Sequence, residues 1–340
     1  MRWAIILAGG SGTRFWPLST PALPKQLLPL AGPQPTAEAS VERLAGLIDR
    51  DKILLVTGRH LAAPLAARLG IPPANVLIEP APKSTGPALV WATHEAAKRD
   101  PAAVVLSLHA DWYVPDVPSF TRVAADALHA AEERPLLITV GVIPTRPETG
   151  FGYIVPGAKE NGSSRVSRFK EKPSPSAAAA LIAEGALWNS GLFAWQAKAL
   201  LAEVRLHAPE MAAALPCLDD GRVEAFFDGC REISIDVGVL ERSSQVAVVA
   251  GAFRWDDLGT WDALARVRPT DAHGNVLVGR VIAIDSSGCI GWSQTAPIVL
   301  AGVANLVAVE ANGRILVMDR SRAGSLKAIL EILPPDIREV

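Results

Sequence analysis

The amino-acid sequence predicts an α/β protein with a mostly parallel sheet, helices on both faces of that sheet, and a small all-β module behind it. Over the first two-thirds of the chain, short continuous apolar runs alternate with helix-like segments, which is typical of buried parallel strands joined by helices. After about residue 270 the pattern changes to short β-type runs separated by Gly, Asn and Ser. The chain has 340 residues, 49% of them hydrophobic and 20% charged, which is enough to bury such a core.

The predicted sheet is Rossmann-like. Its strands are the apolar runs 2–8, 52–57, 103–108 and 136–142. The helices predicted between them are 35–47, 61–69, 86–98 and 119–132. Ligands bind such sheets at the carboxyl ends of the strands, so residues that follow a strand are the first candidates for function.

Residues from about 145 to 265 interrupt this alternation and are rich in Gly, Pro and Trp. They contain predicted helices at 176–184 and 197–203 and a β-run at 165–170. The later β-type runs are 276–284, 298–300, 306–310 and 315–319. We therefore predict two domains, 1–268 and 269–340.

Charge and cysteine content argue against several classes of protein. The formal net charge is −2 and no long basic run occurs, so nucleic acid is not the expected partner. Cys217, Cys230 and Cys289 form no CxxC pair, which fits a reducing cytosol rather than a disulfide framework or a zinc site. The first apolar run is too short for a signal peptide or a membrane span. We expect a cytoplasmic protein without a membrane segment.

A glycine-rich loop with the sequence LAGGSGTRFWP follows the first predicted strand, at residues 7–17. Its glycines leave backbone N–H groups accessible to phosphate oxygens, and Arg14 adds a charge suited to phosphate. The loop lacks the Gly-Lys-Ser/Thr ending of a Walker A motif, and Phe15 stands where a dinucleotide fingerprint needs its third glycine. An ordinary strand-to-loop turn with a surface arginine is the alternative.

Further charged residues follow this loop and the predicted strands. Lys25, after a proline-rich segment, would complement a triphosphate, although a surface lysine is the usual explanation for a single Lys. Asp111 follows the run 103–108, and Asp257 follows the run 245–253. Mg²⁺ takes one or two protein carboxylates together with phosphates and water, so these two acids are the candidate metal ligands. Capping or turn formation is the ordinary alternative, and Asp256 is the adjacent competitor.

Seven segments, taken in order, resemble the sugar-1-phosphate nucleotidyltransferase family in the form of its mannose-1-phosphate guanylyltransferase branch. They are GGSGTRFWP (9–17) with PKQ (24–26), EP (79–80) with TGPA (85–88), PTRPETGFGYI (144–154), FKEKP (169–173), WNSGLF (188–193), SID (234–236) and WDDLGTW (255–261). The resemblance is strong over residues 1–265 and weak beyond them.

The resemblance implies that GTP and mannose 1-phosphate give GDP-mannose and pyrophosphate, with Mg²⁺ held by Asp111 and Asp257 rather than Asp256. The residues it implies for GTP are Leu7, Gly9, Gly10, Gly12, Thr13, Arg14, Lys25, Glu79, Thr85 and Gly86. Those it implies for the sugar are Gly152, Glu171 and Asn189, with Lys172 for its phosphate. The C-terminal module is similar to the family's left-handed β-helix, which implies packing and a homodimer.

Several of these residues also have structural interpretations that need no ligand. Glu79 suits the two N–H donors of a guanine edge, and a solvent-exposed position at a strand end is its alternative. Asn189 can donate and accept hydrogen bonds at a sugar, yet Asn-Ser-Gly is also a turn sequence. Gly152 fits an ordinary hairpin. Glu171 and Lys172, adjacent in an extended segment, are expected to point to opposite faces unless the local backbone twists.

Two alternatives to the implied reaction stay open. The first is the same chemistry with another hexose 1-phosphate or nucleoside triphosphate. The second is a non-catalytic sugar-nucleotide sensor that keeps the fold. Loss of the phosphate-binding cations or of the metal acids would favour the sensor, and the sequence retains all of them.

Overall fold

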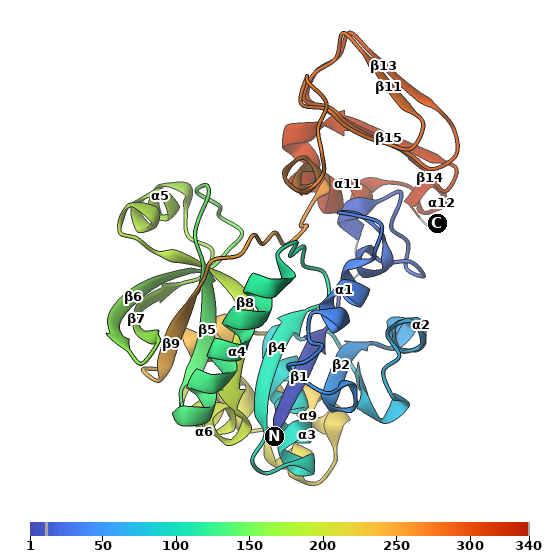
Figure 1. The fold of residues 1–340 in the computed structure, drawn as a ribbon. Helices are drawn as coiled ribbons and strands as arrows, with labels where there is room; N and C mark the ends of the chain where they lie inside the picture. Colours follow the sequence, from blue (N-terminus) through green and yellow to red (C-terminus); the bar gives the residue numbers. More distant parts are fainter. Residues whose placement is uncertain (11–12, 339–340) are drawn as a thin grey trace. The chain divides into compact units, whose positions relative to one another are not determined.

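The computed structural model describes residues 1–10 and 13–338 (Figure 1). The chain forms two compact units, each assembled from segments far apart in the sequence. Unit 1 comprises Met1–Gly9, Ser40–His109 and Val114–Trp255. Unit 2 comprises Gly10–Ala39, Ala110–Tyr113 and Asp256–Val340.

Unit 1 contains one large sheet with the strand order β3-β2-β1-β4-β8-β5-β9-β7-β6. Its strands are β1 (Arg2–Leu7), β2 (Ile53–Gly58), β3 (Val76–Glu79), β4 (Val104–His109), β5 (Leu137–Val142), β6 (Tyr153–Glu160), β7 (Ser163–Lys170), β8 (Leu187–Gln196) and β9 (Val246–Gly251). The predicted α/β class is confirmed, with parallel pairing through β3-β2-β1-β4 and between β5 and β9. Strand β8 separates these two parallel groups and runs antiparallel to both β4 and β5.

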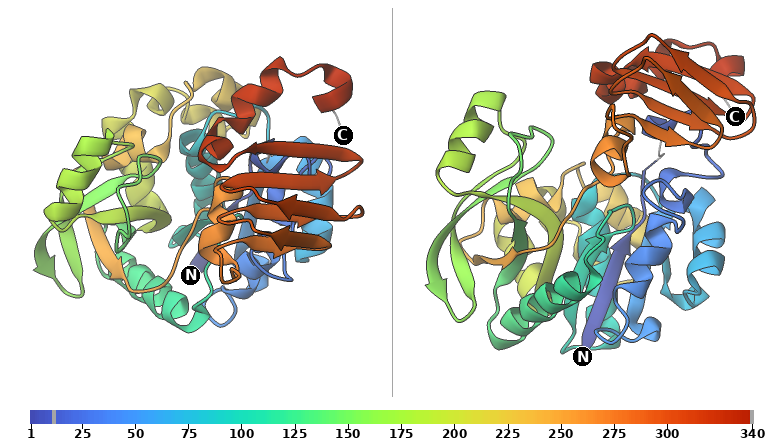
Figure 2. Two further views of the ribbon diagram at one scale, coloured as in Figure 1. Left: turned by 90° about the horizontal axis from the view of Figure 1, so that it is seen from above. Right: turned by 45° about the horizontal axis from the view of Figure 1, so that its top comes forward.

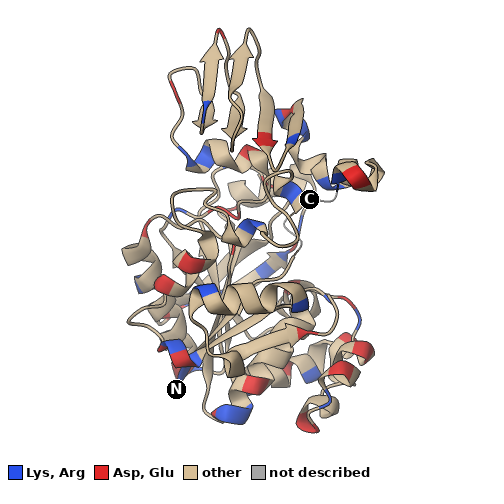
Figure 3. Ribbon diagram, turned by 90° about the vertical axis from the view of Figure 1, so that its right-hand side faces the viewer, with Lys and Arg blue, Asp and Glu red and all other residues tan. Residues whose placement is uncertain are grey.

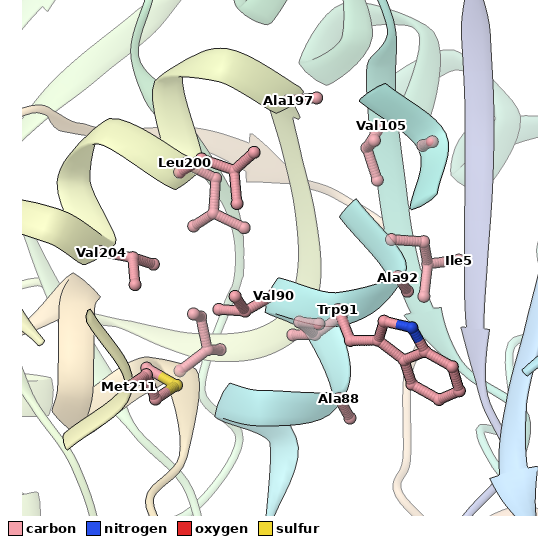
Figure 4. Packing of buried hydrophobic residues seen from close by; sticks show 14 of the residues in the cluster. Ile5, Ala88, Val90, Trp91, Ala92, Val105, Ala197, Leu200, Val204 and Met211 are labelled. Carbon is pink, nitrogen blue, oxygen red and sulfur yellow. The ribbon is translucent and has the colours of Figure 1, made fainter. Parts of the chain in front are cut away.

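Helices cover both faces of this sheet. The main ones are α2 (Arg59–Leu69), α3 (Thr85–Arg99), α4 (Val117–Glu133), α5 (Pro175–Ala183) and α6 (Ala197–His207). Consecutive residues Ala4, Ile5 and Ile6 of β1 are all 0% exposed, which requires cover on both sides because strand side chains alternate. Figure 4 shows Ile5 with residues of α3 and α6 on one side of the sheet. Each such large apolar side chain contributes roughly 1.5–3 kcal/mol when buried.

The predicted helices 61–69, 86–98, 119–132, 176–184 and 197–203 correspond to α2, α3, α4, α5 and α6. The predicted helix 35–47 is shorter, since α1 spans Thr36–Glu42 and turns follow it. Other short helices of unit 1 include α7 (Pro209–Ala212), α8 (Pro216–Asp219), α9 (Val223–Gly229) and a π-helical turn (Asp236–Leu240). Among residues 1–10 and 13–338, every helix is too short or too polar to cross a membrane.

Unit 2 is built around short parallel strands (Figure 2). They are β10 (Val276–Val278), β11 (Val281–Ile284), β12 (Ile290–Ser293), β13 (Ile298–Ala301), β14 (Leu306–Ala311) and β15 (Arg314–Asp319). Strands β10, β12 and β14 pair in parallel, β11 pairs in parallel with β13, and only β15 is antiparallel. Gly279, at φ 80°, divides the run that we predicted as one strand into β10 and β11. The predicted β content is confirmed, and helices α10 (Leu264–Val267), α11 (Leu326–Ile332) and α12 (Pro335–Arg338) accompany it.

Candidate functional site

The glycine-rich loop begins where β1 ends, at Leu7. A Cβ atom on Gly9 would lie 3.7 Å from Oε2 of Glu79, so two predicted nucleotide-binding residues lie close together in unit 1. Gly10 adopts φ 95°, a conformation that other residues rarely take. Thr13 and Arg14 belong to a 3₁₀ turn in which Arg14 is exposed. The predicted residue Gly12 lies outside the described part of the chain.

Glu79 is the last residue of β3. Burial raises the pKa of its carboxyl group to about 7. Near neutral pH this group is therefore divided between its acceptor-only anion and a protonated form that also donates. A ligand that presents two N–H donors would bind the anionic form and so shift this group towards it.

Thr85 and Gly86 open helix α3, and both contact the segment before Asp236. The hydroxyl of Thr85 accepts a hydrogen bond from the N–H of Ile235, at 3.1 Å. The N–H of Gly86 donates to the carbonyl oxygen of Ile233 at 3.0 Å, and a Cβ on Gly86 would lie only 2.5 Å from that oxygen. Glycine is needed here because the two backbones approach so closely. The structure thus gives Gly86 a packing role in unit 1, which the sequence did not reveal.

The two predicted metal acids both belong to unit 2. Tyr113 and Asp256 form an antiparallel bridge, with N···O distances of 2.9 and 3.1 Å, which joins the segments that carry Asp111 and Asp257. Nζ of Lys25 lies 2.6 Å from Oδ2 of Asp111. It also donates to the carbonyl oxygens of Asp257, at 3.5 Å, and Leu258, at 3.4 Å. The structure therefore collects Lys25, Asp111 and Asp257 into one cluster.

Asp257 carries an electrostatic cost in this cluster. Burial, the largest effect, raises the pKa of its carboxyl group; Lys25 opposes that rise, while Asp256 and Asp111 add to it. A bound cation would relieve this cost. Among the described residues no group of three His, Cys, Asp or Glu side chains is placed to hold a metal, so two carboxylates are what this cluster offers.

Asp256, the neighbour of Asp257, has different hydrogen-bond partners. Its carboxylate accepts two hydrogen bonds from the guanidinium of Arg266, at 2.6 and 3.1 Å. It also accepts from the N–H of Leu258, which has the left-handed φ of 48°. Asp256 therefore shapes the turn that carries Asp257, with its charge matched by an arginine.

The predicted sugar residues come together in unit 1. A Cβ on Gly152 would lie 2.5 Å from Oε2 of Glu171 and 3.3 Å from Cβ of Asn189. The backbone N–H of Asn189 donates to the carbonyl oxygen of Gly152, at 2.8 Å. Burial raises the pKa of Glu171, and the nearby Lys172 lowers it. Gly152 thus lies against the acid and the amide that we predicted for the hexose.

Of the two orientations left open for Glu171 and Lys172, the structure has the one with a twisted backbone. Lys172 adopts φ 44°, outside the extended region, and the twist brings its Nζ within 3.2 Å of Oε1 of Glu171. The Lys172 side chain is 65% exposed and that of Glu171 only 15%, so the cation is the accessible member of the pair. Non-glycine residues in this conformation are strained and occur often at functional sites.

Asp236 is the residue that our sequence reasoning missed. Its Oδ1 accepts a hydrogen bond from Nδ2 of Asn189, at 2.7 Å, and Glu171 is close enough to raise its pKa. Burial is the larger cause of that rise, which brings the pKa to about 7. The motif Ser-Ile-Asp at 234–236 was visible in the sequence, yet nothing in it indicated contact with residues 171 and 189.

Known proteins share both the sequence pattern and the fold of this chain. The nucleotidyl transferase family model matches residues 3–274. A mannose-1-phosphate guanylyltransferase of Escherichia coli is 33% identical over 98% of this chain and 74% of its own length. The xanthan biosynthesis protein XanB of Xanthomonas campestris pv. campestris (strain B100) is 35% identical over 96% of this chain and 72% of its own length. A crystal structure from Thermus thermophilus, named a mannose-1-phosphate geranyltransferase, superposes with a TM-score of 0.89 at 37% identity, covering 97% of this chain and 98% of that one.

Proposed function

The chain belongs to the nucleotidyl transferase family and to its mannose-1-phosphate guanylyltransferase branch, and from this premise we propose how its residues convert GTP and mannose 1-phosphate to GDP-mannose and pyrophosphate. The observation that carries the proposal is the match of relatives bearing that activity in their names over nearly the whole chain. The acid clusters of the two units supply the chemistry that this reaction needs.

In the proposed reaction, an oxygen of the sugar phosphate attacks the α-phosphorus of GTP in line. A new P–O bond forms while the bond from the α-phosphorus to the bridging oxygen breaks, and pyrophosphate leaves with the electron pair. The attacking oxygen is already anionic, so no general base and no covalent intermediate are required. Rate enhancement then comes from positioning the phosphates and neutralising their charge.

At the nucleotide, the loop backbone from Leu7 to Thr13 is proposed to contact the phosphates, together with the exposed Arg14. Ionised Glu79 is proposed to accept from the N1–H and exocyclic amino group of guanine. In support of this role, a Cβ on Gly9, at the start of the loop, would lie 3.7 Å from Oε2 of Glu79. Thr85 and Gly86 are proposed to shape this region, since their hydrogen bonds join the 233–235 segment.

The residues of unit 2 fit Mg²⁺. Asp111 and Asp257 present hard oxygen ligands, and the pKa of Asp257 is raised by burial first and then by Asp256 and Asp111, a cost that a cation would offset. We propose that these two carboxylates hold Mg²⁺, which when bound neutralises charge on the reacting phosphates. Lys25 has its three N–H donors directed to Asp111 and to two carbonyl oxygens. Its proposed contact with the triphosphate therefore requires it to give up one of these partners.

At the sugar, Glu171 is proposed to accept from hexose hydroxyls, and Asn189 to donate to one. Lys172 is proposed to hold the attacking phosphate, supported by its exposed ammonium group beside Glu171. Because Gly152 has no side chain, Glu171 and Asn189 can pack directly against its backbone.

We propose that residues 1–268 carry out catalysis and that residues 269–340 form a left-handed β-helix that joins two copies of the chain. The parallel pairing of successive short strands supports the β-helix. Strands β11 and β13 carry no charged residue, and the ribbon of the C-terminal strands is mostly tan in Figure 3. Ile282, Ile284 and Val299 on these strands are 57%, 52% and 61% exposed, a cost that a second copy would remove.

Replacing Ile282 and Val299 by Lys should give a monomer in sedimentation. An oligomeric mass that stays the same as that of the wild type would remove the assembly role.

The reaction is tested by measuring pyrophosphate release over a grid of nucleoside triphosphates and hexose 1-phosphates. Mg²⁺, GTP and mannose 1-phosphate should give the highest kcat/KM, and EDTA should abolish turnover. Turnover with a uridine or thymidine triphosphate and none with GTP would overturn the guanylyl assignment. No turnover with any pair would favour the sensor.

A further inference from the structure

The side-chain amide of Asn189 has little hydrogen-bonding capacity left. Its Oδ1 accepts from the hydroxyl of Thr139, at 2.9 Å, and from the N–H of Gly191, at 3.2 Å. A backbone N–H can only donate, so the atom that faces Gly191 must be the amide oxygen. Both lone pairs of that oxygen are used, and Nδ2 already donates to Asp236. One N–H of Asn189 is therefore all that it can offer to a sugar.

A hexose ring presents hydroxyl groups that must donate as well as accept. With Asn189 reduced to a single donor, the acceptors near it have to come from other side chains. Glu171 is one, and it is already within 3.2 Å of Lys172. Asp236 is the other carboxyl group in contact with Asn189.

Asp236 differs from an ordinary buried structural acid. It opens the π-helical turn Asp236–Leu240, and such turns occur often at functional sites. Its carboxyl group receives hydrogen bonds from its own backbone N–H and from Asn189, both neutral donors. Lys172 attracts it only as the weakest of the effects on its pKa, while Glu171 repels it. The residue as a whole is partly exposed to solvent, while burial is the largest effect on the pKa of its carboxyl group.

We propose that Asp236 is a further hexose-recognition residue: one of its oxygens orients the amide of Asn189, and the other accepts a hydrogen bond from a hydroxyl of the sugar. Thr139 is a positioning residue that completes this arrangement from the opposite side of the amide. An acid held by neutral donors suits a neutral hydroxyl, because no cation has to be displaced when the sugar binds. This inference rests on the proposed function, since it assumes that a hexose 1-phosphate binds beside Glu171.

The test compares D236N with wild type, using mannose 1-phosphate and its deoxy analogues lacking one hydroxyl each. The exposed Glu232, in the same segment, provides the matched control E232Q with an equal change of charge. D236N should raise the KM for mannose 1-phosphate about ten- to hundred-fold and leave the KM for GTP unchanged, as expected for one charged hydrogen bond. For the analogue that lacks the contacted hydroxyl, wild type and D236N should differ little, whereas E232Q should match wild type throughout.

Two results would overturn the proposal. One is an equal penalty for D236N with every deoxy analogue, because a contact with one hydroxyl must disappear when that hydroxyl is removed. The other is a rise in the GTP KM as large as that for the sugar phosphate, with a lowered thermal midpoint, which would make Asp236 a structural residue. T139S, which keeps the hydroxyl, should retain the wild-type KM, and T139V should raise it for the sugar phosphate alone. If wild type does not use mannose 1-phosphate, the proposed function fails first; the D236N comparison is then made with the hexose 1-phosphate that it does use.

Discussion

The acid clusters of the two units neutralise their charges in different ways. In unit 2, Asp256 has a bidentate guanidinium partner and Asp111 has an ammonium group within 2.6 Å. In unit 1, the hydrogen bonds that Asp236 receives from the described residues come from neutral N–H donors, and it lies near a second acid, Glu171. Neutralised acids such as Asp256 hold the backbone in place. Acids left with a charge penalty, such as Asp236 and Asp257, are the ones that a ligand can relieve.

The largest expected effect separates the adjacent acids Asp256 and Asp257 of unit 2. D257N should lower kcat about hundred-fold or more, because a metal carboxylate is lost, and should keep or raise the thermal midpoint. The rise is expected because the pKa of Asp257 is raised, which means that its charge destabilises the fold. The measurements are steady-state kinetics and thermal unfolding.

The matched variant D256N removes the negative charge and one of the two acceptor oxygens, so Arg266 loses its bidentate partner, while the remaining amide oxygen can still accept from Leu258. It should cost about 1–3 kcal/mol of stability, because buried donors lose a charged partner, and change kcat much less than D257N does. If D256N instead abolished turnover at an unchanged thermal midpoint, the distinction between a structural and a functional acid in this turn would be wrong.

The next effect separates the cations by substrate. Lys172, whose side chain is 65% exposed beside Glu171, should face the sugar phosphate, and the exposed Arg14 should face the phosphates of GTP. K172A should mainly raise the KM for mannose 1-phosphate, and R14A mainly that for GTP, each about ten- to hundred-fold. Kinetics with one substrate varied at a time decides the matter. A K172A variant that alters only the GTP parameters would move the sugar-phosphate role to another residue.

A smaller effect concerns the isolated acid Glu79, whose pKa burial raises to about 7. Two guanine donors need its ionised form, so the KM for GTP should rise as the pH falls below about 7. E79Q should remove this pH dependence and raise the KM about ten-fold. Inosine triphosphate, which lacks the exocyclic amino group, should be affected less by E79Q than GTP is. Equal penalties for the two nucleotides would place Glu79 away from the base.

A last effect acts on stability rather than on turnover, and is a pH-dependent shift at Asp236. Its folded-state pKa of about 7 lies above its ordinary value of 3.8, so its contribution to stability is fully present below about pH 4 and is lost as the pH rises through 7. The thermal midpoint of D236N minus that of wild type should therefore increase between about pH 4 and about 7 and then level off. E232Q serves again as the control variant. A flat difference for D236N would mean that its carboxyl group is not electrostatically strained.

Part of the fold was predictable because its signals are local. The apolar runs that became β1, β2, β4 and β5 and the helices between them follow from periodicity alone. Strand β8 did not, because its Asn-Ser-Gly segment has the composition of a turn. Pairing with β4 and β5 overrides that composition, and Gly191, at φ 78°, lies in the β8 strand near the register shift opposite β5.

The sequence by itself determined which chemical groups this protein has: a glycine loop followed by Arg14, a set of acids near strand ends, and motifs in an order typical of one family. Only the tertiary structure decided what each group has left to offer a ligand. Arg266 matches the charge of Asp256 and not that of Asp257, and Thr139 and Gly191 use the lone pairs of Asn189. Charge neutralisation and hydrogen-bond saturation depend on which partners folding brings within about 3 Å, whether they are near in the chain, as Asp256 and Arg266 are, or distant, as Thr139 and Asn189 are. The acceptor role that we propose for Asp236 therefore became visible only once residues 139, 189 and 236 met.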